Sequence, residues 1–261
     1  MVKRVYKIKG SGFVGEVIIE QEKRLKGLDA TTIKFIAIAA MLIDHVAWAF
    51  VPTYSVLGQG MHIIGRITAS IMCFFIVEGY HHTKNIENYI LRMAIFAIVS
   101  HLPFVFFETG YISLFGNTGV IYTLLLGLLA LVAYNNIKSK PLKILAILAL
   151  CLLAMFGDWM CITILMVLNF EKFRGDFKKQ AIGHIIISIL VVVGLPLLSG
   201  QAQYIYSQLF QLGMILALPI LYFYNGQQGE FAVKHKKFSK WVFYIFYPAH
   251  LLILGLLKLY I

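Results

Sequence analysis

The chain has 261 residues, of which 60% are hydrophobic and only 13% are charged, and its mean hydropathy is +0.81. This composition excludes a soluble domain built around one core and predicts an all-α, polytopic integral membrane protein. The formal net charge of +11 is typical of nucleic-acid-binding proteins, but the basic residues here gather in alternate loops between apolar runs. We therefore expect no nucleic-acid partner.

The N-terminal segment, residues 1–26, contains seven Lys or Arg and three Glu, and it has no apolar run long enough to span a membrane. Its alternating stretch VYKIKGSGFVGEVIIE fits either a short strand or a segment lying on the membrane surface. The first apolar run that follows is about 20 residues long, which predicts a retained span and not a cleaved signal peptide. The expected organisation is a basic cytoplasmic segment, 1–26, followed by one membrane domain, 27–261.

Nine apolar runs predict about nine transmembrane helices. They fall at about 31–51, 57–79, 88–107, 118–135, 141–156, 159–170, 181–199, 203–224 and 240–260. The sixth run has only about a dozen residues, so it is marginal for a full span.

The loops between these runs predict the topology. The loops after the even-numbered runs contain all the basic loop residues, and those after the first, third, fifth and seventh contain no Lys or Arg. Together with the N-terminal segment, 19 of the 23 basic residues lie on one side. The positive-inside rule then places the N-terminus in the cytoplasm and the C-terminus outside, with anionic lipid headgroups as the partners of the basic loops.

The first predicted helix contains the stretch KFIAIAAMLIDH, from Lys34 to His45, with a cation at one end and an acid beside an imidazole at the other. Ten residues separate Lys34 from His45, so the two groups lie about 16 Å apart along the helix. An Asp within the bilayer core costs about 2.5–3.5 kcal/mol on insertion scales, which makes Asp44 and His45 candidates for a functional site. The alternative is an interhelical hydrogen bond that only stabilises the bundle.

Other ionisable residues fall within the later helices. Arg66 lies near mid-membrane in the second helix, where it requires an anion, and His62 lies one turn away on the same face. Glu78 and Arg92 lie near the cytoplasmic ends of neighbouring helices, where they can either pair with each other or bind a ligand. We expect His62 and His184 to be structural.

Three further ionisable residues are predicted either at the membrane depth of His45 or at the extracytoplasmic side. His101 and His250 lie at about the depth of His45, and Asp158 places a carboxylate at the extracytoplasmic mouth. The three cysteines, Cys73, Cys151 and Cys161, lie in apolar runs without metal-ligand spacing, and no metal site is expected.

Several segments, in this order, resemble the TraX family of membrane acetylases, which is named for pilin N-acetylation in conjugation. These segments are KFIAIAAMLIDH, GRITASIMCFFIVEGYHHTKN, YILRMAIFAIVSHLP, GVIYTLLLGLL, GDW, LPILYFYNG and YIFYPAHLLIL. The chain also resembles the wider acyltransferase-3 superfamily, whose first helix carries an Arg, ten residues and then a His. Lys34 departs from that pattern at the Arg position, and Ser70 departs from it where a proline is expected.

The resemblance implies a multi-pass protein of the bacterial cytoplasmic membrane that moves an acetyl group from cytoplasmic acetyl-CoA to an extracytoplasmic amine or hydroxyl. It implies that His45, with Asp44 beside it, acts as general base, and that Arg66 stabilises the oxyanion or positions the thioester.

The resemblance also implies a coenzyme site at the cytoplasmic end, formed by Lys34 and Arg92 with Glu78. The remaining site lining would come from His101, Asp158, Tyr247 and His250. The acceptor is expected to be a pilin N-terminus or another surface peptide or glycan. The alternative function is a proton-coupled transporter of a small solute, which also places His, Asp and Arg at mid-depth.

Overall fold

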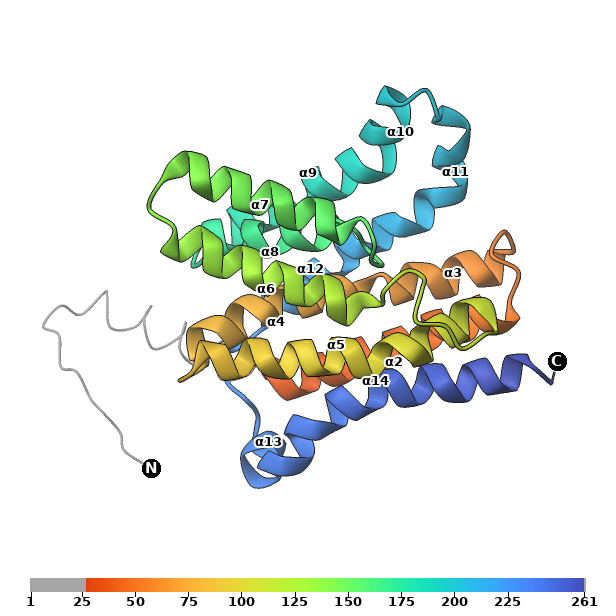
Figure 1. The fold of residues 1–261 in the computed structure, drawn as a ribbon, viewed down its shortest axis with the longest axis horizontal. Coiled ribbons are helices and arrows are strands. Elements are labelled where there is room, and N and C mark those ends of the chain that lie inside the picture. Colours follow the sequence, from red (N-terminus) through yellow and green to blue (C-terminus); the bar gives the residue numbers. More distant parts are fainter. Residues whose placement is uncertain (1–26, 261) are drawn as a thin grey trace, which may run out of the picture.

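The computed structural model describes residues 27–260, and side chains throughout this range except at 236–240. The basic segment 1–26, with its possible strand, lies outside the described residues. Every regular element in the described range is a helix (Figure 1), which confirms the predicted all-α class.

The helices follow one another through the whole described range. In chain order the α-helices are α2 (Ala30–Phe50), α3 (Val56–Gly65), α4 (Ile67–His82), α5 (Ile86–Thr109), α6 (Val120–Asn136), α7 (Lys140–Ala154), α8 (Ile162–Lys172), α9 (Phe177–Ile189), α10 (Leu195–Leu198), α11 (Ile205–Gln208), α12 (Ala217–Tyr222), α13 (Glu230–Lys234) and α14 (Lys236–Lys258). A π-helical turn, η1 (Leu190–Gly194), joins α9 to α10, and the 3₁₀ segments η2 (Ala202–Tyr204) and η3 (Leu209–Leu216) flank α11.

Each of the nine predicted apolar runs corresponds to a helical stretch in the described residues. Six of these stretches are long and apolar enough to cross a membrane, and α6 adds a shorter apolar helix. Helices α7 and α8 have 15 and 11 residues. A helix that crosses the whole bilayer needs about 20 residues, so these two are too short for a full crossing. The fold is therefore that of a polytopic helical membrane protein with unequal helices.

Two features of the helices bear on the site. Helix α2 begins where expected, because the Asp29 carboxylate accepts a hydrogen bond from the Thr32 backbone N–H at 2.9 Å. The second predicted span runs from α3 through Arg66 into α4, because Arg66 has helical backbone angles of φ −61° and ψ −19° and its backbone N–H donates to the His62 carbonyl at 3.0 Å. The Arg66 side chain lies against α2, where it contacts the Asp44 carboxylate.

The bundle is organised around α2, α4, α5, α6 and α14, which run side by side in Figure 1. Helix α14 packs along both α5 and α2, so the end of the described chain lies against its beginning. Helix α7 lies at the periphery and exposes Leu142, Leu145 and Leu148, an arrangement typical of a lipid-facing helix. The buried polar side chains come from the five central helices, from α3 and Arg66, and from α8 and α9.

Candidate active site

A cavity of about 490 Å³ lies among α2, α4, α5, α6, α14 and the segment that follows α12. Both Ala30 and Met41 line it, and because they are eleven residues apart on α2 the cavity extends about 16 Å along that helix. Glu78, His82 and the segment after α12 form one end, the mouth, at the predicted cytoplasmic side. The other end, the floor, is formed by Met41, Val120, Ile121 and Tyr247.

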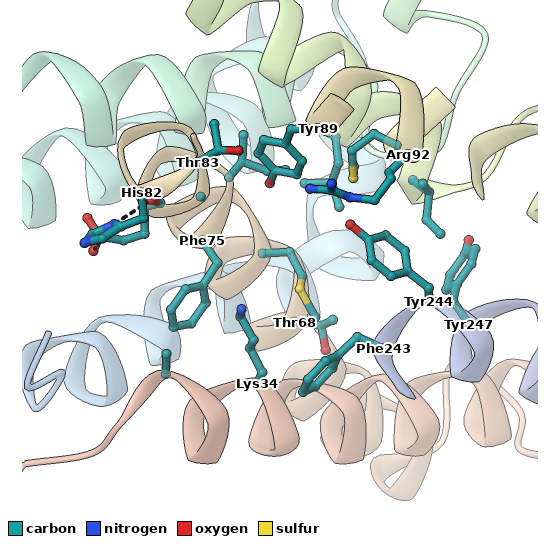
Figure 2. A pocket seen from close by; sticks show the side chains of 18 of the residues that line it. Lys34, Thr68, Phe75, His82, Thr83, Tyr89, Arg92, Phe243, Tyr244 and Tyr247 are labelled. Carbon is teal, nitrogen blue, oxygen red and sulfur yellow. Dashed lines mark hydrogen bonds and ion pairs between the residues drawn. The ribbon is translucent and has the colours of Figure 1, made fainter. Parts of the chain in front are cut away.

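Two cationic side chains enter the cavity from opposite sides, as Figure 2 shows. The Lys34 ammonium lies 4.8 Å from the ring centroid of Phe75, and the Arg92 guanidinium lies 5.7 Å from that of Tyr89. Within residues 27–260 neither cation has a carboxylate partner, and Nε of Arg92 is buried without a hydrogen bond. Two cations without counter-ions in one cavity favour an anionic ligand.

Glu78 does not pair with Arg92, so the expected alternative of a structural ion pair between them is wrong. Its carboxylate instead accepts hydrogen bonds from Arg174, at 3.3 Å, and from the Tyr224 hydroxyl, at 3.4 Å. Burial, and then the adjacent Glu78 carboxylate, raises the pKa of Tyr224 to about 12, so the hydroxyl keeps its proton as a donor. Glu78 therefore anchors the mouth of the cavity and leaves Arg92 free.

His45 and His250 meet through their rings. The His250 Nδ1–H donates to the Phe246 carbonyl at 2.7 Å, so in the neutral ring Nε2 is an acceptor. That Nε2 lies 3.0 Å from Nδ1 of His45, which is also 2.9 Å from the Met41 carbonyl. Both contacts require His45 to carry its proton on Nδ1.

The consequence for His45 is that its Nε2 keeps a lone pair, and no described residue donates to it. The ring lies just beyond the cavity floor, one helical turn after Met41. Its centroid is 6.5 Å from that of Tyr247, which lines the floor. An imidazole with one nitrogen held by acceptors and the other open is the arrangement of a general base.

Asp44 points to a different set of partners, as the turn of about 100° between helix neighbours requires. Its carboxylate accepts from Nδ1 of His62 at 2.8 Å and contacts the Arg66 guanidinium. Arg66 also donates to Gln211 at 3.4 Å. Asp44 therefore neutralises Arg66 and joins α2 to α3, and it does not orient His45.

Arg66 and His62 are enclosed by aromatic rings away from the cavity lining. The guanidinium lies 5.1 Å from the Trp159 ring and 5.6 Å from the Phe210 ring. His62 is fully buried between Trp48 and Phe210. Although the Nε2 of His62 also lacks a partner, the rings close its surroundings, which agrees with the expected structural role.

The structure does not bring every predicted residue to this cluster. Nε2 of His101 is held at 3.0 Å by the Leu114 carbonyl in the loop between α5 and α6. Asp158, by contrast, lies near the cluster. It belongs to the turn between α7 and α8, where its backbone N–H donates to the Thr118 carbonyl, and its carboxylate lies within electrostatic range of Arg66 and Tyr247. His184 is buried and its Nε2 lies 3.1 Å from the Met214 carbonyl and 3.3 Å from the Ser70 hydroxyl, a structural arrangement.

Apart from Tyr247, the sequence analysis did not identify the aromatic residues that line the cavity, and it did not identify the role of Arg174. Phe75, Tyr89, Phe243 and Tyr244 read as ordinary apolar positions in their helices, and Arg174 as one of several basic loop residues. One feature of the sequence could have indicated this lining: Tyr244 and Tyr247 are three residues apart, which puts both side chains on one face of α14.

The fold and the site together define a polytopic helical membrane protein with a cation-lined cavity that ends beside a pair of histidines. Residues 29–258 match the family described as TraX protein, and the chain belongs to that family.

The chain is also similar to a curated protein, the probable fimbrial assembly protein FimC, serogroup H1, of Dichelobacter nodosus. The two are 30% identical over 244 residues, which cover 89% of this chain and 96% of the relative. No solved structure matches the chain.

Proposed function

We propose that this protein is a membrane acetyltransferase that takes acetyl-CoA from the cytoplasm and acetylates an amine or hydroxyl presented from the other side of the membrane. The observation that carries the proposal is the cavity itself. It holds two cations without counter-ions along its length and ends beside an imidazole whose Nε2 is open.

The donor would enter at the mouth. Lys34 and Arg92 would bind the phosphates of coenzyme A, a task for which ammonium and guanidinium groups are both suited. The aromatic rings around them would pack against the pantetheine arm, and the thioester would reach the floor near Tyr247. The placement of Lys34 where the acyltransferase-3 superfamily has Arg keeps the charge and replaces a planar bidentate donor by a single ammonium group.

The chemistry would centre on His45. The acceptor heteroatom attacks the thioester carbonyl carbon, and its proton passes to Nε2 of His45. The carbon–sulfur bond then breaks, and the coenzyme A thiolate takes that proton from the imidazolium. The neutral Nε2 of His250, which accepts from Nδ1 of His45, would stabilise the imidazolium while it exists.

The acceptor would come from the extracytoplasmic side, since the cavity mouth serves the donor. The name of the Dichelobacter nodosus relative, a probable fimbrial assembly protein, supports a fimbrial subunit as acceptor, with another surface peptide or a glycan as the broader class. The protein would reside in the bacterial cytoplasmic membrane, with anionic lipids along its basic loops.

The test is thioester turnover by the purified protein in detergent. Acetyl-CoA is supplied with a peptide that has a free N-terminal amine, and both thiol release and peptide acetylation are followed. We expect thiol release that depends on the peptide and matches the acetyl group it gains. No thioester loss, together with proton-driven uptake of a solute by reconstituted vesicles, would instead establish the transporter alternative.

A further inference from the structure

We infer that the hydroxyl of Tyr247 is the oxyanion donor of the reaction, a role that rests on the proposed acetyl transfer. Tyr247 lines the floor of the cavity, and its side chain is buried. Its ring lies 6.5 Å from that of His45 and 5.7 Å from that of His250. Figure 2 shows it at the end of the cavity opposite His82. A thioester carbonyl within reach of the His45 base would lie beside this hydroxyl.

The hydrogen of the Tyr247 hydroxyl is available. The oxygen accepts a hydrogen bond from the Val120 backbone N–H at 3.2 Å, and no described residue accepts a hydrogen bond from the hydroxyl. A buried hydroxyl whose oxygen is held and whose proton is unused is placed to donate to a ligand.

The backbone group that holds this oxygen strengthens the donor. Val120 is the first residue of α6, a helix of 17 residues whose N-cap, Gly119, makes no side-chain capping bond. The Tyr247 oxygen therefore accepts a hydrogen bond from a backbone N–H that has no acceptor within its own helix and that lies at the positive end of the helix dipole. A hydroxyl that accepts one hydrogen bond donates a second more strongly.

Gly119 leaves the space that this contact requires. A Cβ atom at Gly119 would lie 2.4 Å from the Tyr247 hydroxyl oxygen and 3.1 Å from the Phe104 ring. Because φ at Gly119 is −74°, the backbone conformation suits any residue, and glycine is demanded by the close approach of the hydroxyl and, to a lesser degree, of the Phe104 ring.

Arg66 is less suited to the same role. Its guanidinium contacts the Asp44 carboxylate, donates to Gln211 and does not line the cavity. A cation already paired with a carboxylate stabilises a developing negative charge less than a donor held ready for it.

The step attributed to Tyr247 is the formation and collapse of the tetrahedral intermediate. As the acceptor heteroatom bonds to the carbonyl carbon, the carbonyl π pair moves onto oxygen, which accepts a hydrogen bond from Tyr247. When that pair returns, the carbon–sulfur bond breaks and coenzyme A leaves. The hydroxyl keeps its proton throughout.

The experiment compares Tyr247→Phe with the wild-type protein in the thiol-release assay. The variant keeps the ring and removes one oxyanion donor, so we expect kcat to fall by about 10²–10³-fold. The KM for acetyl-CoA, the Kd for coenzyme A and the ascending limb of the pH profile of kcat should stay unchanged, because the cations and His45 remain. A purely structural hydroxyl would move binding and stability together with kcat.

Two further variants sharpen the test. Tyr122→Phe is the matched control, because its hydroxyl donates to the Leu153 carbonyl at 3.1 Å outside the cavity, and kcat should be unchanged. Gly119→Ala should lower kcat in the wild-type background and have a much smaller effect in the Tyr247→Phe background, since the displaced hydroxyl is then absent.

The possible results distinguish failure of the Tyr247 role from failure of the proposed acetyl transfer. A Tyr247→Phe protein that retains the wild-type kcat, or loses coenzyme A binding together with kcat, overturns the inference alone. Absence of thiol release from the wild-type protein overturns the proposed function and the inference with it.

Discussion

His45 and His250 lie 205 residues apart in the chain, and their contact is what gives His45 a defined tautomer. With Nδ1 committed to the Met41 carbonyl and to His250, only Nε2 can take a proton from an acceptor. His62 and His184 lack this combination of an open nitrogen and a place beside the cavity.

The role of the base is tested by His45→Ala, which should lower kcat for acetyl transfer by about 10²–10⁴-fold while coenzyme A still binds. His184→Ala is the control. Because the His184 ring, among the described residues, is hydrogen-bonded to the Met214 carbonyl and the Ser70 hydroxyl, its loss should affect stability and leave kcat of the folded protein nearly unchanged. If His45→Ala kept full activity, or if the large loss of kcat appeared in His62→Ala and not in His45→Ala, another residue would be the general base.

The two cavity cations make a separate prediction. Lys34→Gln or Arg92→Gln removes a charge-assisted hydrogen bond worth about 1.5–3 kcal/mol, so the KM for acetyl-CoA should rise about 10- to 100-fold and depend less steeply on salt. Lys258→Gln is the control, since that ammonium donates to the Phe107 carbonyl and does not line the cavity. An unchanged KM in both cavity variants would argue against a phosphate site.

At the scale of the elements, the close packing of α2 on α3 positions Asp44. A Cβ at Gly65 would lie 2.2 Å from the Asp44 Cβ, so the two helices approach closely beside the Asp44–Arg66 contact. The sequence indicated that Arg66 requires an anion, but it did not identify Asp44 as that anion, because the contact depends on packing between helices.

Gly65→Ala should therefore destabilise the protein by about 1–3 kcal/mol, since the added methyl group overpacks the contact with Asp44. Gly60→Ala in the same helix meets no atom within 4 Å and should be neutral or stabilising, by up to about 1 kcal/mol, through helix propensity. Thermal unfolding of both variants in detergent measures the difference. Equal midpoints would show that the helices separate at little cost.

At the scale of the molecule, the apolar runs predicted the helical class and the order of the helices, because spans are specified by local composition. The sequence also predicted Lys34 and Arg92 for a single coenzyme site, and both side chains line the same cavity. The partners of these groups were not predictable. Arg174 reaches Glu78 from 96 residues away, and such contacts depend on packing between helices, which the periodicity of one helix does not encode.

The predicted topology is open to direct labelling. In a background without the three native cysteines, Lys140→Cys and Lys234→Cys should react with a membrane-impermeant thiol reagent only in permeabilised cells. Tyr111→Cys and Gln201→Cys should react in intact cells. All four positions are exposed, so the pattern reports the side of the membrane. Reaction of Lys140→Cys in intact cells would reverse the assignment of sides.

Transfer across the membrane is tested most directly in sealed vesicles that carry the protein in one orientation. Acetyl-CoA with a labelled acetyl group is supplied only at the cytoplasmic face, and a peptide with a free N-terminal amine is supplied only at the opposite face. We predict that the label reaches the peptide, and that His45→Ala slows this transfer without loss of coenzyme A binding. Label that never reaches the peptide, or that reaches only acceptors on the side of acetyl-CoA, would contradict the account.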